Sequence, residues 1–109
     1  CKRCHEQQYQ QWANSPHAHA FATLEHASKQ ADQTCVKCHV TGYSEPSGFT
    51  AAAGTPDMKN VQCEVCHGKG TEHNRAAPQA VTEALCRNCH QGEYEKGFNF
   101  AAALPLVSH

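Results

Sequence analysis

One five-residue motif, C-x-x-C-H, occurs four times in this chain of 109 residues, at positions 1–5, 35–39, 63–67 and 86–90. These copies are called motifs 1 to 4, and they contain all eight cysteines. The spacing is the attachment signature of c-type heme. Two thiols add across the two vinyl groups of one porphyrin, and the imidazole of the following residue becomes an axial ligand of the iron. The repeats therefore predict four covalently attached hemes, numbered here as their motifs.

The residues that this chemistry requires fall into two sets. The thioether bonds would be formed by eight cysteines: Cys1, Cys4, Cys35, Cys38, Cys63, Cys66, Cys86 and Cys89. The proximal iron ligands would be four histidines: His5, His39, His67 and His90. The two residues inside each motif share no chemical property from copy to copy, as expected if they only span two thioether bonds.

Zinc binding and thiol redox chemistry are the alternative interpretations of C-x-x-C pairs. Two such pairs can form a Cys4 zinc site, and the 19 residues between Cys66 and Cys86 suit a zinc ribbon. A redox pair of the thioredoxin type is the other alternative. Neither requires a histidine directly after the second cysteine, and that histidine is present in all four copies. The sequence favours heme over both.

The composition limits the apolar core that the polypeptide can build. Residues 1–109 predict a single domain. The chain is 39% hydrophobic but contains only four Phe, one Trp and one Met. A chain this short buries little apolar surface by itself, so the porphyrins would supply most of the core. We expect a small, mostly α-helical fold built around hemes, with long loops and little or no sheet, that requires heme to fold.

Charge and hydropathy restrict the partners and the compartment. A formal net charge of −1 argues against a nucleic-acid partner. No apolar run approaches the length of a membrane span. Heme of this kind is attached outside the cytoplasm, so we expect an exported periplasmic or extracellular protein, either processed or excised from a longer chain. Its partners would be redox proteins that donate and accept electrons.

The N-terminal third of the chain predicts two helices. Residues 6–13 predict a short helix directly after motif 1. Residues 16–29 predict a second, with proline at its first position, where the missing N–H costs little. Within it His17, Phe21 and Leu24 are spaced to share one face, so an imidazole would lie among apolar side chains.

The remainder of the chain predicts short elements around the other motifs. Asp32 is expected to cap a turn of helix that carries motif 2. Residues 41–60 are rich in Gly, Pro and Ser and predict a long loop, with a brief strand pair as an alternative. A helix from about Val81 would carry motif 4, and Pro105 is expected to break the C-terminal stretch.

Five histidines lie outside the motifs: His17, His19, His26, His73 and His109. An isolated histidine is usually solvated or hydrogen-bonded. Five of them beside four predicted hemes favour bis-histidine ligation, in which a second imidazole binds the iron from the distal side. Met58 is the only methionine, so His/Met ligation is open to at most one heme.

Three stretches of the sequence resemble the cytochrome c-554 family. They are motif 1 with Tyr9, Trp12 and Ser15-Pro16-His17-Ala18; motif 2 with Val40-Thr41-Gly42-Tyr43; and Val61-Gln62 with motif 3, Gly68, Gly70 and His73. Members of this family are tetraheme electron carriers known from ammonia oxidation, and similar modules occur within larger multiheme proteins. The resemblance covers nearly the whole chain, although the connection before motif 4 and the tail are shorter here.

The resemblance implies distal ligands for three hemes. His17 would bind the iron of heme 3, His73 that of heme 1 and His109 that of heme 4. The family's namesake has a five-coordinate heme 2. His19 and His26 match no family ligand, which leaves open whether one of them binds heme 2; we favour His26, because it lies nearer to motif 2.

These observations favour electron transfer through four closely spaced irons, mostly with bis-histidine ligation. Such ligation leaves no coordination site for a substrate, and it favours lower reduction potentials than His/Met ligation. No catalytic residues of a hydrolase are evident. Two alternatives remain: a small-molecule reductase, acting for example on a nitrogen oxide at an open heme 2, and a module or filament subunit of a larger multiheme conduit.

Overall fold

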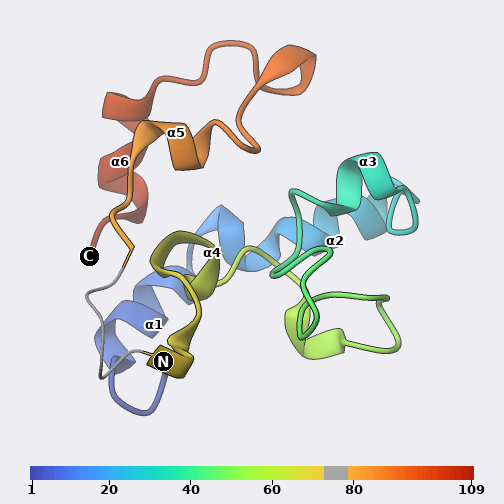
Figure 1. The fold of residues 1–109 in the computed structure, drawn as a ribbon. Helices are drawn as coiled ribbons and strands as arrows, with labels where there is room; N and C mark the ends of the chain where they lie inside the picture. Colours follow the sequence, from blue (N-terminus) through green and yellow to red (C-terminus); the bar gives the residue numbers. More distant parts are fainter. Residues whose placement is uncertain (73–78) are drawn as a thin grey trace.

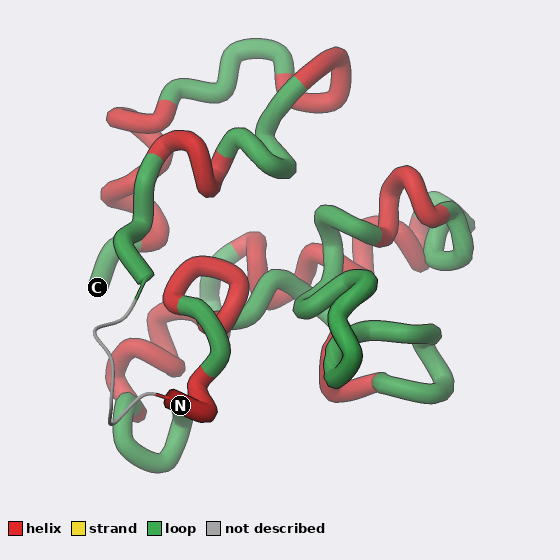
Figure 2. Tube along the Cα trace, viewed as in Figure 1, coloured by secondary structure: helices red, strands yellow, loops and turns green. Residues whose placement is uncertain are grey.

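The computed structural model describes residues 1–72 and 79–109. Six short α-helices lie along the described chain: α1 (Glu6–Ala13), α2 (Ala20–His26), α3 (Gln33–Val36), α4 (Cys63–His67), α5 (Glu83–Cys86) and α6 (Phe100–Val107). Four 3-10 helices join them: η1 (Pro16–His19), η2 (Pro56–Met58), η3 (Gly70–Glu72) and η4 (Gly92–Glu95). Figure 2 shows helices and loops without strands, so the predicted mostly α-helical class is confirmed for the described residues.

The helices are arranged in an open framework (Figure 1). The α1 and α4 helices lie at one side, and α2 leads from them to α3 and the loop of residues 41–60 at the other. The α5 and α6 helices form a separate upper part. The Cα radius of gyration is 14.0 Å, only slightly above the roughly 13 Å expected for a chain of this length.

The apolar core is small and lies between α2, motif 2 and the loop that follows motif 2. It consists of Phe21, Leu24, Val36, Val40 and Phe49. Phe21 is 1% exposed, and its ring centre lies 5.6 Å from that of Phe49. The core therefore joins α2 to motif 2 and to the following loop, while motifs 1, 3 and 4 lie outside it.

Both N-terminal helices form, with one difference in length. The α1 helix has the predicted bounds. The second begins as η1 at Pro16 and continues as α2, but it ends at His26. Ser28 has a φ of 55°, and the Lys29 N–H bonds to the Leu24 carbonyl. This is the left-handed helix end that glycine usually provides, here formed by serine.

The turn before motif 2 and the loop after it agree with the sequence pattern. Asp32 caps α3, with its Oδ1 accepting from the Thr34 N–H at 3.0 Å. Residues 41–60 form a loop that contains η2. In place of a strand pair, a single isolated bridge joins Val40 to Lys59.

The C-terminal helices differ from the prediction at the start of α5 and at Pro105. Thr82 caps α5, which begins two residues after the expected start. Pro105 was expected to break the final stretch, and this is wrong, because α6 runs through it to Val107. Inside a helix, proline cannot donate the backbone hydrogen bond and its ring crowds the carbonyl one turn earlier, so Pro105 weakens α6 without ending it. The Ser108 N–H still closes the helix on the Leu104 carbonyl at 2.9 Å.

Candidate functional site

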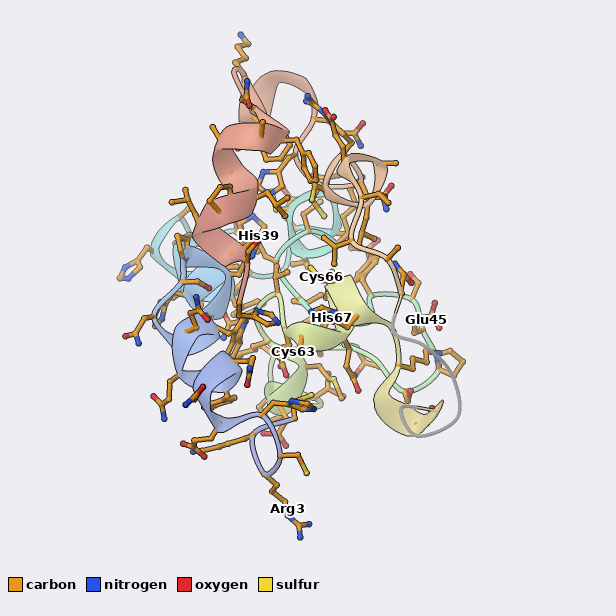
Figure 3. All side chains as sticks on the ribbon, turned by 90° about the vertical axis from the view of Figure 1, so that its left-hand side faces the viewer. Arg3, His39, Glu45, Cys63, Cys66 and His67 are labelled. Carbon is orange, nitrogen blue, oxygen red and sulfur yellow. The ribbon has the colours of Figure 1, made fainter. Side chains whose placement is uncertain are left out.

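Each motif adopts a helical turn, which explains how its spacing works. In motif 1 the Cys1 carbonyl accepts from the N–H groups of Cys4 and His5, and in motif 4 the Cys86 carbonyl accepts from those of Cys89 and His90. Motif 3 is the helix α4 itself. In motif 2 the Cys38 N–H bonds to the Cys35 carbonyl, and the His39 N–H bonds to the Val36 carbonyl. Residues at i, i+3 and i+4 share one face of a helix, so a helical turn brings two thiols and one imidazole to the same side. Figure 3 shows this set for Cys63, Cys66 and His67 in the middle of the molecule.

The proximal histidine of motif 2 is oriented by the start of α2. His39 Nδ1 lies 2.6 Å from the Ala20 carbonyl oxygen and 3.3 Å from Thr23 Oγ1. A carbonyl can only accept, so Nδ1 carries the proton and Nε2 is left as the free lone pair. Because the two ring nitrogens lie on nearly opposite edges, Nε2 is directed away from the first turn of α2. Such a contact is typical of a metal-binding histidine.

His17 lies beside the histidine of motif 4. The ring centres of His17 and His90 are 6.0 Å apart. The backbone fixes this position, because the His17 carbonyl accepts from the Val61 N–H and Trp12 Nε1 donates to the Val61 carbonyl at 2.8 Å. Burial, followed by the nearby His90, lowers the pKa of His17. A neutral imidazole is the form that binds a metal.

His109 lies beside the histidine of motif 3. The ring centres of His67 and His109 are 5.5 Å apart. Gln11 Nε2 on α1 donates to the carbonyl of Ser108 at 3.0 Å, which ties the end of the chain to α1. The pKa of His67 is lowered by burial and then by His109.

These two ring pairs differ from the order that the family resemblance implied. The resemblance assigned His17 to motif 3 and His109 to motif 4, whereas the rings lie next to motif 4 and motif 3, respectively. Two imidazoles that bind one metal from opposite sides have ring centres roughly 6 Å apart, because each metal–nitrogen bond is about 2.0 Å. Both observed separations are close to this value, so each pair is spaced to hold one iron.

The other spare histidines are distributed differently. His73 lies outside the described residues. His19 and His26 are exposed, on η1 and at the end of α2, and neither has a ring contact with a motif histidine within the described part of the chain. The assignment of His26 to heme 2 stays a prediction. Met58 packs against the apolar core and lines the cavity between motifs 1 and 3.

The thiols of different motifs converge in pairs. A cavity of about 280 Å³ is lined by Cys1 and Cys63, together with Tyr9, Trp12 and Met58. A second cavity, of about 170 Å³, is lined by Cys38 and Cys89. Motif 1 thus faces motif 3, and motif 2 faces motif 4.

The pKa shifts of two thiols reflect the contact between motifs 2 and 4 and a further one between motifs 3 and 4. Burial, with the adjoining Cys38 thiol, raises the pKa of Cys89 to about 12. Burial raises the pKa of Cys66 as well, with Cys86 of motif 4 as the next cause. Motifs 3 and 4 are therefore also neighbours.

The residues present fit covalently bound heme. All eight thiols are free. Ser15 Oγ is buried without a hydrogen-bond partner within residues 1–72 and 79–109, an arrangement that costs free energy unless a bound group satisfies it. In the same residues no three Cys, His, Asp or Glu side chains are grouped to hold a metal ion, as a Cys4 zinc site would need.

Two contacts of the motif histidines could not be anticipated from the motif search. The Ala20 carbonyl that orients His39 belongs to the backbone and leaves no signal in the sequence. Glu95, whose Oε1 lies 3.4 Å from His90 Nδ1, is five residues beyond motif 4. Scanning for carboxylates that follow a motif closely would have found it.

Comparison with known proteins identifies the family. Residues 1–68 match the family described as cytochrome c554 and c-prime. The chain belongs to this family. Its resemblance to the cytochrome c-554 family is thereby confirmed, and its relatives are multiheme c-type cytochromes, which supports bound heme c and electron transport.

Three curated proteins are similar to this chain. Cytochrome c-554 of Nitrosomonas europaea is 34% identical over 118 residues, which cover 92% of this chain and 50% of that protein. The C-type polyheme cytochrome OmcC of Geobacter sulfurreducens is 34% identical over 76 residues, 56% of this chain and 10% of that protein. The multiheme cytochrome MtrA of Shewanella baltica is 26% identical over 97 residues, 72% of this chain and 29% of that protein.

The chain spans half or less of the length of these relatives. No solved structure matches it. In the described parts of the chain, no helix has both the length and the apolar character needed to cross a membrane.

Proposed function

We propose that this chain carries electrons through four covalently bound hemes, one at each motif. The eight motif cysteines would form the thioether bonds, and His5, His39, His67 and His90 would be the proximal ligands. When bound, each heme would supply one iron that accepts and releases a single electron. The observation that carries the proposal is the hydrogen-bonded turn that each of the four motifs forms, because such a turn brings two thiols and an imidazole to one side.

We assign the distal ligands from the ring pairs. His17 would complete the site of His90, and His109 that of His67, because their separations of 6.0 and 5.5 Å suit two imidazoles on one iron. His73 keeps the assignment to heme 1 that the resemblance implies. Compared with the ligands that the resemblance implies, His17 and His109 exchange places: His17 would bind the iron of heme 4, and His109 that of heme 3.

The paired cavities support an order of electron transfer. Motifs 1 and 3 share one cavity, motifs 2 and 4 share the other, and Cys66 of motif 3 lies near Cys86 of motif 4. Electrons would then pass in the order 1, 3, 4, 2 or the reverse, with donor and acceptor proteins at opposite ends. The heme attachment chemistry also implies an exported protein, in the periplasm or outside the cell.

Two further functions each have an observation in their favour. The chain covers only 10% to 29% of the polyheme and multiheme relatives OmcC and MtrA, which supports a role as a module of a larger conduit. Reduction of a small molecule such as a nitrogen oxide is the other. His39 Nδ1 faces the first turn of α2, so Nε2, the nitrogen that would bind the iron of heme 2, is directed away from that turn and from His19 just before it.

The experiment that tests the carrier proposal is coulometric titration of the purified holoprotein. Four electrons per chain are expected, and two or fewer would contradict it. Carbon monoxide binding to the reduced protein then separates the carrier from the reductase. One site per chain would support an open heme 2, and no binding would favour closure by His26 or His19.

A further inference from the structure

The segment after motif 4 folds back onto the histidine of that motif. This return loop, residues 91–98, contains η4 and two glycines with positive φ, Gly92 at 72° and Gly97 at 97°. The Phe98 N–H bonds to the Glu95 carbonyl at 3.3 Å, which closes the loop. The fold thereby brings both residues back to His90.

Two side chains of the return loop contact the imidazole of His90 from different directions. The Phe98 ring is stacked on it, with centres 4.5 Å apart and planes inclined by 15°. Glu95 Oε1 lies 3.4 Å from Nδ1, within ion-pair distance. Stacking limits rotation of the imidazole, so the edge that carries Nδ1 stays turned toward the carboxylate.

The Arg87 guanidinium lies against Phe98, and its charge is paired with another carboxylate. The Arg87 guanidinium binds Glu83 Oε1 at 3.0 Å and also donates to the Phe98 carbonyl at 3.3 Å. Its position over the Phe98 ring, 4.9 Å from the centre, holds Phe98 in place. Arg87 therefore supports the stack while its charge is paired with Glu83.

The proximal histidines of motifs 2 and 4 differ in what faces Nδ1. His39 has a neutral partner, the Ala20 carbonyl, and His90 has an anionic one, the Glu95 carboxylate. A partner at the outer nitrogen raises the basicity of a metal-binding imidazole, and an ionised partner acts more strongly than a neutral one. A more basic ligand stabilises ferric over ferrous iron.

We propose that Glu95 is a positioning residue that lowers the reduction potential of heme 4 through His90. This inference rests on the proposed function, because it requires a heme at motif 4. It assigns a role to a residue outside the C-x-x-C-H motif and predicts that heme 4 accepts an electron less readily than it would without the carboxylate.

The test compares three variants of the holoprotein by potentiometric titration. Glu95→Gln keeps the shape of the side chain and removes its charge. Glu95→Asp keeps the charge. Glu45→Gln removes an equal charge from an exposed ion pair with Lys69 and is the matched control.

Glu95→Gln is expected to raise the midpoint reduction potential of one of the four hemes. At a fixed applied potential, the ferrous-to-ferric ratio of that heme should increase at least threefold relative to the control. This is about 28 mV, at 59 mV for each tenfold change in a one-electron couple. One low-spin signal in the electron paramagnetic resonance spectrum should change with it. Glu95→Asp should stay closer to the wild type than Glu95→Gln.

Equal shifts of the midpoint potential in Glu95→Gln and Glu45→Gln would overturn the inference. A potential shift in Glu95→Asp as large as that in Glu95→Gln would overturn it as well. Intact mass separates these outcomes from failure of the proposed function. A wild-type protein with four hemes and unmoved potentials in Glu95→Gln refutes the role of Glu95 alone. A wild-type protein without heme at motif 4 refutes the function on which the inference rests.

Discussion

Replacing His17 by alanine should remove the sixth ligand from one iron and leave every heme attached. The His17 ring lies 6.0 Å from His90, and burial lowers its pKa, so the imidazole is neutral and spaced to bind. One of four hemes is affected, so about a quarter of the total ferric heme should change from low-spin to high-spin. The reduced variant should also bind one more carbon monoxide per chain than the wild type.

His19→Ala is the matched control, because His19 lies two residues further along the same short helix and is exposed. It should leave the low-spin signal unchanged unless His19 binds heme 2. An unchanged spectrum in His17→Ala would refute the proposed ligation of His17.

A second substitution identifies which iron His17 serves. If His17 and His90 share an iron, His17→Ala combined with His90→Met should remove one native low-spin signal, and His17→Ala combined with His67→Met should remove two. The order implied by the family resemblance predicts the reverse. Intact mass must show four hemes in each variant, and the reverse count would contradict the ring pairs.

Three further predictions concern stability. Phe21→Ala should lower the free energy of unfolding of the holoprotein in urea by about 3–5 kcal/mol, because the ring is 1% exposed. The control Leu106→Ala, whose side chain is 77% exposed, should change this free energy by less than about 0.5 kcal/mol. Equal losses in the two variants would contradict the assigned core. Asn99→Ala should cost about 1 kcal/mol by the same assay, since Asn99 Oδ1 caps α6 through the Ala102 N–H; no loss would mean that this cap does not form. The hydrogen bonds from the Thr34 hydroxyl and N–H lower the pKa of Asp32 below its usual range. The stability that the carboxylate adds is therefore present at neutral pH and lost as the pH falls through its folded-state pKa. Asp32→Ala should be less stable than the wild type at pH 7 and equally stable in strong acid. A difference in stability that persists in acid would refute this pH dependence.

Local features of the sequence predicted much of the fold and nominated the residues of the site, whose binding of heme stays a prediction. The motif cysteines and histidines, the bounds of α1 and the Asp32 cap all follow from short-range rules. The end of α2 at His26 was missed because a serine, Ser28, provides a left-handed turn that is usually formed by glycine.

Long-range arrangement could not be predicted in the same way. The approach of His109 to His67 depends on a hydrogen bond from Gln11 to Ser108, 97 residues away along the chain. No spacing in the sequence encodes that contact. The partners of Nδ1 in His39 and His90 likewise depend on how α2 and the return loop pack, and one of them is a backbone carbonyl.

The proposed electron transfer requires four hemes bound to this one small domain. Intact mass spectrometry of the protein matured in a host that attaches c-type heme is the most direct test. The expected mass is that of the 11.9 kDa polypeptide plus four hemes, with all eight thiols consumed. The bare polypeptide mass, or a mass with two or fewer hemes, would contradict it.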